Sequence, residues 1–210
     1  MTAIIDYGAG NIKSVENALH RLGGDPVLTA DPAVILSADH VILPGVGAFG
    51  EAMERLHESG MDAVIRQAVQ KGIPFLGICL GLQLLFDSSE ESPGVQGLGI
   101  LPGRILRLPE EGPAESSTVH YKVPEIGWND LTYPRKGRLF VGVPEHSYVY
   151  FVHSYYLKAD DPSIVTARTT YSTQIDASVE KDNVFACQFH PEKSERVGMQ
   201  ILTNFLQVSR

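Results

Sequence analysis

The chain has few cysteines, a deficit of basic residues and no long hydrophobic run. Its two cysteines, Cys79 and Cys187, are too few for a disulfide framework. The 17 basic residues against 25 acidic ones give a formal net charge of -8, which argues against nucleic acid or an anionic membrane surface as the main partner. The longest apolar stretch, residues 73–86, is too short and too interrupted to cross a bilayer. We therefore expect a small molecule or another protein as partner.

Other features that the sequence lacks further narrow the class of protein. The histidines other than His190 show no metal-ligand spacing, so we expect no catalytic metal, and nothing indicates another cofactor. Residues 1–6 lack the basic and long apolar segments of a signal peptide, which favours a cytoplasmic location. The composition, with 43% hydrophobic residues in a chain of 210, is typical of one globular domain, here residues 1–210.

Strand and helix patterns alternate through the first part of the chain. Residues 3–5 form a short apolar run, and apolar residues at helical spacing follow from Ile12 to Leu22. The alternation continues with expected strands at 27–28, 41–43 and just before Cys79, and with expected helices at 49–57 and 61–71. This order predicts an α/β fold of the flavodoxin-like kind, an open and mostly parallel sheet flanked by helices. Its site should lie at the carboxyl ends of the strands.

The pattern changes in the second half of the chain. Between residues 97 and 179, short β-rich runs alternate with turns, which predicts an antiparallel β extension. Residues 110–117 form a polar loop with Pro and Gly. A last helix at about 194–208 carries an apolar face that should close the core.

The Gly-x-Cys-x-Gly turn around Cys79 is the most informative segment. In a nucleophile elbow, side chains two residues away on either side would collide, and Gly77 and Gly81 remove those collisions. A cysteine just before a helix also faces unsatisfied backbone N–H groups, which favour the reactive thiolate. Taken alone, Cys79 could equally be a small buried residue between two glycines.

A possible base and carboxylate follow a second apolar run at residues 184–188. Cysteine nucleophiles need an imidazole to take and return a proton and a third group to orient that imidazole. Cys79, His190 and Glu192 could fill these roles.

A glycine-rich loop, residues 44–50, joins a strand to a helix. Its glycines let backbone N–H groups approach a ligand closely, although a simple turn would have the same composition. Acyl transfer needs donors for a tetrahedral oxyanion, and the N–H groups of Leu80 and of the Val46 region are natural candidates.

These residues together resemble the triad-type, or class I, glutamine amidotransferases. Within that family, the chain is similar to the glutaminase subunits of imidazole glycerol phosphate synthase. The resemblance spans nearly the whole chain and is carried by residues 6–14, 44–49, 77–81, 127–129, 151–156 and 188–194.

The resemblance implies a reaction and a set of site residues. Cys79 would attack the side-chain amide of L-glutamine, His190 would protonate the departing ammonia, and water would hydrolyse the thioester to glutamate. Glu192 would orient His190, and Val46 and Leu80 would form the oxyanion hole. By the same resemblance, glutamine would be held by Gly47, Gln83, Glu91 and the backbone around Ser154 and Tyr155.

The resemblance also implies a partner. Ammonia would pass to a separate (β/α)8-barrel cyclase subunit, which makes imidazole glycerol phosphate and an aminoimidazole carboxamide ribotide in histidine biosynthesis. Candidates for the surface that faces this subunit are Asn11, Lys13, Trp128 and Lys181. Trp128 could instead be an ordinary core or rim aromatic, and Lys181 could lie in a solvated turn. One departure is Glu125, since the family usually has histidine after Val-Pro at this point.

Three alternatives remain open at this stage. The chain could be the glutaminase subunit of another synthase, such as pyridoxal phosphate or anthranilate synthase. It could be a free-standing cysteine hydrolase acting on γ-glutamyl groups, which would turn over alone. A catalytically inactive module is the third alternative, and the complete triad disfavours it.

Overall fold

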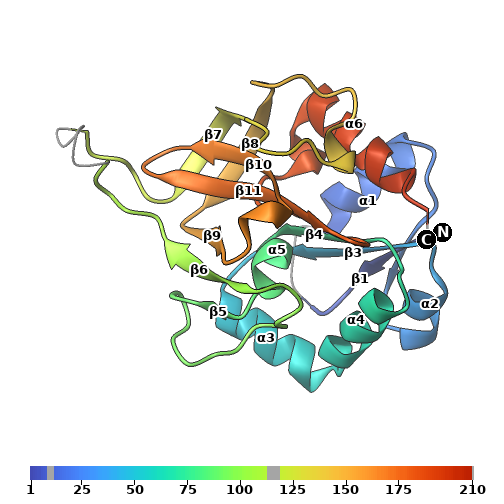
Figure 1. The fold of residues 1–210 in the computed structure, drawn as a ribbon. Coiled ribbons are helices and arrows are strands. Elements are labelled where there is room, and N and C mark those ends of the chain that lie inside the picture. Colours follow the sequence, from blue (N-terminus) through green and yellow to red (C-terminus); the bar gives the residue numbers. More distant parts are fainter. Residues whose placement is uncertain (9–11, 113–118, 210) are drawn as a thin grey trace.

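The main sheet of the computed structural model confirms the predicted α/β fold. The structure describes residues 1–8, 12–112 and 119–209, and within them this sheet has seven strands in the order β10-β11-β12-β4-β3-β1-β2 (Figure 1). Strands β2, β1, β3, β4 and β12 pair in parallel, whereas β11 and β10 add antiparallel at one edge. The strands are β1 (Thr2–Ile5), β2 (Pro26–Thr29), β3 (His40–Gly45), β4 (Phe75–Cys79), β10 (Val165–Thr170), β11 (Gln174–Lys181) and β12 (Val184–Cys187).

Helices cover both faces of this sheet because its strands are apolar on both sides. On β3, Val41 and Leu43 enter one buried cluster with α3 and α4, whereas Ile42 enters the other cluster with α1 and α6. Alternate side chains of a strand point to opposite faces, so such a continuous apolar run requires two helical layers. Figure 1 shows α1 and α6 on one side of the sheet and α2, α3 and α4 on the opposite side. The helices are α1 (Ile12–Arg21), α2 (Pro32–Ser37), α3 (Phe49–Glu58), α4 (Met61–Gln70) and α6 (Glu195–Leu206).

The region predicted as one antiparallel extension is divided among three sheets. Strands β10 and β11 extend the main sheet itself. A second sheet pairs β6 (Gly103–Arg107) antiparallel with β9 (Tyr155–Ala159) and parallel with the short β5 (Ser88–Ser89). A third pairs β7 (Glu125–Asp130) with β8 (Tyr148–His153). The predicted antiparallel strands are therefore confirmed, but they belong to three sheets and do not form a single extension.

Helix α2 is not anticipated by the hydrophobic pattern, because six residues are too few to show helical spacing. It begins where the Asp31 side chain accepts a hydrogen bond from Ala33 N at 2.8 Å and where Pro32 occupies the first helical position. No helix in the described ranges combines the length and apolar character needed to span a membrane.

The carboxyl ends of the parallel strands lie at one edge of the sheet. Gly45 at the end of β3 is in register with Cys79 at the end of β4, and Cys187 at the end of β12 is in register with Ile78. The glycine-rich loop, the elbow and the segment that contains His190 therefore leave the sheet side by side.

Candidate active site

Cys79 occupies a strained turn between β4 and the short helix α5 (Leu80–Leu84). Its φ of 55° and ψ of -110° lie where residues with a side chain are rarely found. A Cβ at Gly77 would lie 2.6 Å from the Gly81 carbonyl oxygen, and a Cβ at Gly81 would lie 1.9 Å from that of Leu43. Both distances are far below van der Waals contact, so the role predicted for the two glycines is confirmed.

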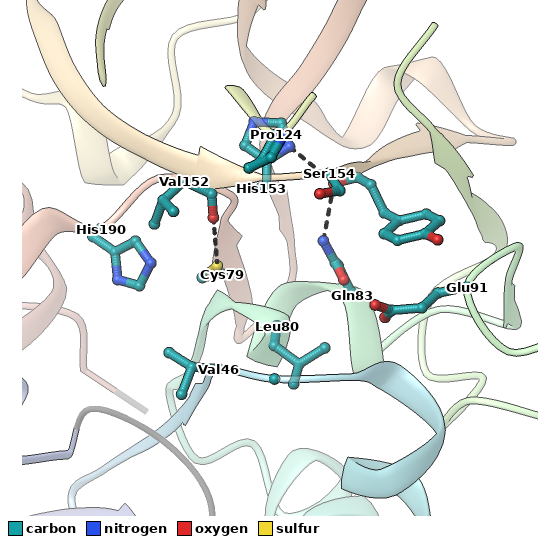
Figure 2. A pocket seen from close by; sticks show the side chains of 12 residues that line it. Val46, Cys79, Leu80, Gln83, Glu91, Pro124, Val152, His153, Ser154 and His190 are labelled. Atoms are coloured by element: carbon teal, nitrogen blue, oxygen red, sulfur yellow. Dashed lines mark hydrogen bonds between the residues drawn. The ribbon is translucent and has the colours of Figure 1, made fainter. Parts of the chain in front are cut away.

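His190 and Glu192 form a buried pair beside this elbow. The Nδ1 atom of His190 lies 2.7 Å from Glu192 Oε1, and the two side chains are 3% and 1% exposed. This contact fixes the proton on Nδ1, which leaves Nε2 as the atom that exchanges protons. Within the described part of the chain, Nε2 has no hydrogen-bond partner. A buried nitrogen without a structural partner, in a ring beside Cys79 (Figure 2), is suited to proton transfer.

Opposing effects set the pKa of His190. Burial lowers it, but the interactions with the Cys79 sulfur and with Glu192 raise it, and the balance brings the pKa to about 9. The imidazole is therefore held in its charged form at neutral pH, as a proton donor to a leaving group must be.

The backbone around His190 is anchored to β8. His190 N donates to Tyr150 O at 2.9 Å, and Tyr150 N donates to Ser194 Oγ at 2.9 Å. Ser194 Oγ in turn donates to His190 O at 2.6 Å. These three bonds fix the position of the ring relative to the pocket wall that β8 forms.

Cys79 and His190 open onto a cavity of about 290 Å³. Every residue predicted to act as nucleophile, base, oxyanion donor or substrate contact lies on its wall, and Glu192 lies behind His190. The lining residues are Val46, Gly47, Cys79, Leu80, Gln83, Glu91, Pro124, Val152, His153, Ser154, Tyr155 and His190. Residues from six separate parts of the sequence thus line one small cavity (Figure 2).

The side chain of Gln83 has a fixed orientation in this cavity. Its Nε2 donates to Tyr155 O at 3.0 Å and to Gln188 Oε1 at 3.1 Å, which uses both amide hydrogens. Gln83 Oε1 therefore remains as an acceptor. Glu91, whose Oε2 accepts from Phe49 N at 2.8 Å, points its carboxylate toward Gln83 (Figure 2). Two neighbouring acceptors, one of them charged, suit an ammonium group.

The glycine-rich loop lies directly beside the nucleophile. Gly45 pairs with Cys79, and a Cβ at Gly45 would lie 2.8 Å from the Tyr7 hydroxyl and 2.9 Å from Leu80 Cβ. The Tyr7 hydroxyl donates to Pro44 O at 3.1 Å and so holds the loop from behind. Gly47 has a φ of 101°, which favours glycine. The tight packing places the Val46 and Leu80 segments next to Cys79 on the wall of the cavity.

The comparisons with known proteins agree with this geometry. Residues 3–208 match the family described as Glutamine amidotransferase class-I. The chain belongs to this family. A relative from Moorella thermoacetica, named imidazole glycerol phosphate synthase subunit HisH, is 49% identical over 99% of this chain and 95% of its own. Another of the same name, from Methanothermobacter thermautotrophicus, is 46% identical over the full length of both chains.

Solved structures of other proteins have a similar fold. A structure of PurLQS from Thermotoga maritima superposes with a TM-score of 0.74 at 21% identity, covering 98% of this chain and 96% of its own. A structure described as a glutamine amidotransferase gives a TM-score of 0.73 at 20% identity, with 98% and 97% covered. At this identity the likeness is one of fold, and it matches the amidotransferase architecture described above.

The residues predicted to face a partner are not all brought together. Trp128 lies on β7 and is 47% exposed, and Lys13 lies on α1 with an exposed side chain that contacts Glu16. Asn11 lies outside the described residues. Lys181 pairs with Val184 at the start of β12, at the edge of the sheet opposite to Cys79. Because β11 runs antiparallel to β12, its last residue points away from the site.

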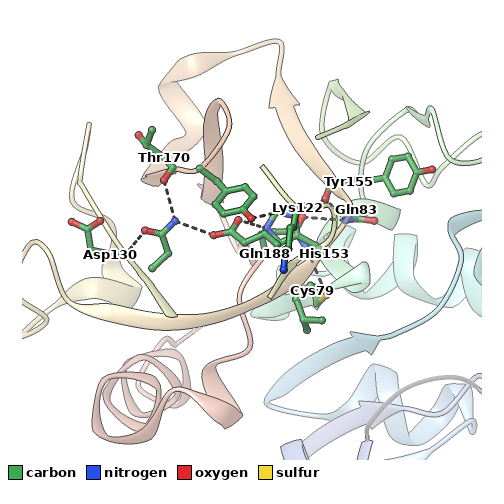
Figure 3. A network of polar contacts seen from close by, with 12 residues as sticks. Cys79, Gln83, Lys122, Asp130, His153, Tyr155, Thr170 and Gln188 are labelled. Atoms are coloured by element: carbon green, nitrogen blue, oxygen red, sulfur yellow. Dashed lines mark hydrogen bonds and ion pairs between the residues drawn. The ribbon is translucent and has the colours of Figure 1, made fainter. Parts of the chain in front are cut away.

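Two features of the pocket are missed by the sequence analysis. One is Gln188, a completely buried amide that contacts both Gln83 and Cys79. The other is the buried pair of His153 and Glu125, whose Nε2 and Oε2 atoms lie 3.1 Å apart without an aligned hydrogen bond. His153 Nδ1 also lies 2.9 Å from Tyr155 O (Figure 3), so the ring contacts a residue of β7 and a residue of β9. Glu125, which stands where the family usually has histidine, is therefore buried against the ring of His153.

The described residues contain no group of three or more His, Cys, Asp or Glu side chains placed to hold a metal ion.

Proposed function

We propose that this chain is the glutaminase subunit of an imidazole glycerol phosphate synthase, which releases ammonia from L-glutamine for a (β/α)8-barrel cyclase subunit. The observation that carries the proposal is the buried His190–Glu192 pair beside a cysteine on a strained elbow, at the mouth of one cavity. Support for the pathway comes from relatives of 46 to 49% identity that carry this synthase name and align over nearly the whole chain.

The reaction follows from the roles of the three side chains. The Cys79 sulfur attacks the carbonyl carbon of the glutamine side-chain amide, and the carbonyl oxygen becomes an oxyanion. His190 Nε2 gives its proton to the nitrogen, which leaves as ammonia while the thioester forms. His190 then takes a proton from water, the resulting hydroxide attacks the thioester, and glutamate leaves with Cys79 restored. Glu192 keeps the ring aligned and stabilises its charge throughout.

Substrate recognition uses the other residues of the cavity. The acceptors Gln83 Oε1 and Glu91 would hold the α-ammonium group of glutamine. Backbone groups of Gly47, Ser154 and Tyr155 would fix the rest of the amino acid, and the N–H groups of Val46 and Leu80 would bind the oxyanion. This arrangement selects an amino acid whose side-chain carbonyl reaches Cys79 when its ammonium group reaches Glu91.

The outer face of the β7–β8 ladder is the proposed docking surface for the cyclase subunit. Ile126, Trp128 and Tyr148 are 64%, 47% and 58% exposed there, an unusual cluster of large apolar side chains on a surface. Ile126 pairs with Val152, which lines the cavity, so the surface adjoins the site where ammonia forms. Lys13, in the first turn of α1, is a further candidate, because α1 packs beside η4 (Pro191–Lys193), the turn that follows His190. Asn11, outside the described residues, stays a candidate on the resemblance alone.

A cytoplasmic site of action belongs to the same proposal. Both cysteines are free, which fits a reducing compartment.

The partner dependence of the reaction tests this function. The purified chain is assayed for glutamate release alone, with the cyclase subunit of a HisH-containing synthase, and with the partner subunit of anthranilate synthase as a control. We expect slow turnover alone and a rise of at least about tenfold with the cyclase subunit only. Full turnover by the chain alone would favour a free-standing hydrolase, and activation by the control partner would favour another synthase.

A further inference from the structure

We propose that Gln188 is a working part of the site, which donates a hydrogen bond to the Cys79 sulfur and fixes the orientation of Gln83. The inference rests on the proposed glutaminase function. Gln188 directly follows β12, its side chain is completely buried, and its backbone N donates to Ala177 O at 2.9 Å. The residue is therefore held rigidly at the end of a central strand.

Both ends of the Gln188 amide contact site residues. Its Nε2 donates to Cys79 Sγ at 3.7 Å, within the range for a sulfur acceptor, and its Oε1 accepts from Gln83 Nε2 at 3.1 Å. Figure 3 shows the three side chains as one polar network. A buried amide is costly unless its donor and acceptor are both satisfied. Here Cys79 Sγ accepts from the amide and Gln83 Nε2 donates to it. The polar partners of Gln188 are therefore residues of the reaction site and not of the hydrophobic core.

The contacts of the Cys79 sulfur explain what this donor contributes. The thiol can donate to Val152 O, which lies 3.9 Å from Sγ (Figure 2). A carbonyl oxygen stabilises the thiol and repels the thiolate, whereas an N–H group stabilises the thiolate. Gln188 thus offsets the effect of Val152, in the same sense as the charged ring of His190. Loss of Gln188 would leave the sulfur facing the carbonyl with one donor fewer.

The second contribution concerns the orientation of Gln83. Tyr155 O and Gln188 Oε1 occupy both amide hydrogens of Gln83 and direct its Oε1 to the cavity. Without the Gln188 oxygen, only Tyr155 O still holds the Gln83 amide in this orientation, so the rotated amide that presents its NH2 group to the site becomes more populated. An NH2 group repels an ammonium ion, so substrate binding would weaken as well.

Among side chains of this length, glutamine is the one that can both donate to the Cys79 sulfur and accept from Gln83. Glutamate would place acceptors against both the sulfur and Gln83, and in its ionised form it would oppose the thiolate. Methionine keeps the length and volume but offers neither donor nor strong acceptor. Asparagine is one methylene shorter and cannot span the same two partners.

The test measures the reactivity of Cys79 without using glutamine. Wild type, Gln188→Met and Gln188→Glu are alkylated with iodoacetamide across pH 5 to 10, and mass spectrometry counts only the label on Cys79. We expect the half-maximal rate to shift upward by about one pH unit in Gln188→Met, a tenfold loss at neutral pH, and by more in Gln188→Glu. In the complex with the cyclase subunit, Gln188→Met should also lower kcat and raise KM, because it acts on the sulfur and on Gln83.

A second variant separates the two contributions. Gln83→Leu removes the contact to Gln188 Oε1 but leaves the donor to the sulfur, so it should raise KM and leave the alkylation profile near that of wild type. Alkylation profiles that coincide in wild type and both Gln188 variants would overturn the inference. Failure of both Gln188 variants to fold, judged by circular dichroism, would overturn it too, because it would assign the residue to the core. A wild-type chain that releases no glutamate would count against the proposed function, while the alkylation comparison would still decide the role of Gln188.

Discussion

The carbonyl oxygen of Leu43 lies so close to Gly81 that a Cβ on Gly81 would be 1.9 Å from it. This close approach packs the backbone of β3 against α5. Position 81, two residues after Cys79, therefore has no room for a side chain larger than hydrogen. The strained φ of 55° at Cys79 depends on this close approach, because no larger residue would let the chain turn so sharply.

Replacing Gly81 by alanine should therefore destabilise the protein strongly. We expect a loss of about 3 kcal/mol or more in the free energy of unfolding, since backbone atoms of β3 and α5 must separate. Gly60→Ala is the matched control: its φ of 70° is also positive, but a Cβ there would meet nothing within 4 Å. That control should cost only about 1 kcal/mol. Equal losses in chemical denaturation would contradict the steric account of the elbow.

Glu192→Gln should change the pH dependence of the reaction. Burial lowers the pKa of His190, and Cys79 and Glu192 together raise it to about 9. Removing the charge of Glu192 removes one of the raising causes, so the pKa falls and the charged ring is lost at a lower pH. We expect the alkaline limb of the kcat profile in the complex to move toward neutrality, with a smaller loss of activity at neutral pH than in Cys79→Ala. An alkaline limb that stays in place would show that Glu192 does not tune His190.

Glu91→Gln tests the ammonium site. The neutral side chain can still accept the hydrogen bond from Phe49 N, so the start of α3 should be preserved. The charge proposed to face the substrate ammonium is lost, which should raise KM by about 10- to 100-fold with little change in kcat. A fall in kcat at unchanged KM would place Glu91 in the chemical step instead. Thermal denaturation of the variant is the control for folding.

Lys13→Ala and Lys181→Ala form a matched pair for the docking surface. Both remove an exposed lysine, but Lys181 lies at the edge of the sheet opposite to the pocket. We expect Lys13→Ala to weaken binding of the cyclase subunit in calorimetry and Lys181→Ala to leave the affinity unchanged. Weaker binding in Lys181→Ala alone would move the interface to the other edge.

Trp128→Ala tests the apolar part of the same surface. The side chain is half-exposed and makes an edge contact to Tyr150, so its loss should cost little stability. It should nevertheless weaken binding of the cyclase subunit by at least about 2 kcal/mol, as loss of an aromatic anchor does. Unchanged affinity in the same calorimetric experiment would remove the β7–β8 ladder from the interface.

The sequence predicted those parts of the site that local spacing determines. The elbow depends on three residues within five positions, and His190 and Glu192 are two positions apart, so their motifs could be interpreted without knowing the fold. The alternation of strands and helices then placed both segments at the carboxyl edge of one sheet. Gln188 carried a usable signal as well, because it lies two positions before His190, and alternate residues at a strand end point to the same face.

Non-local pairing accounts for what the sequence could not predict. Glu125 and His153 meet only because β7 and β8 pair in a register that sets these residues opposite each other. Lys181 lies at the edge opposite to the pocket because β11 runs antiparallel to β12, and no local sequence pattern indicates that reversal. The division of the antiparallel region into three sheets likewise depends on contacts between segments distant in sequence.

The most direct measurement assays the complex of the cyclase subunit with Cys79→Ala, supplied with either L-glutamine or ammonium salts. We predict that product forms from ammonium at close to the wild-type rate and that no product forms from glutamine, since only the thioester step is lost. Glutamine-dependent product formation by this variant would contradict the assignment of Cys79 as the nucleophile.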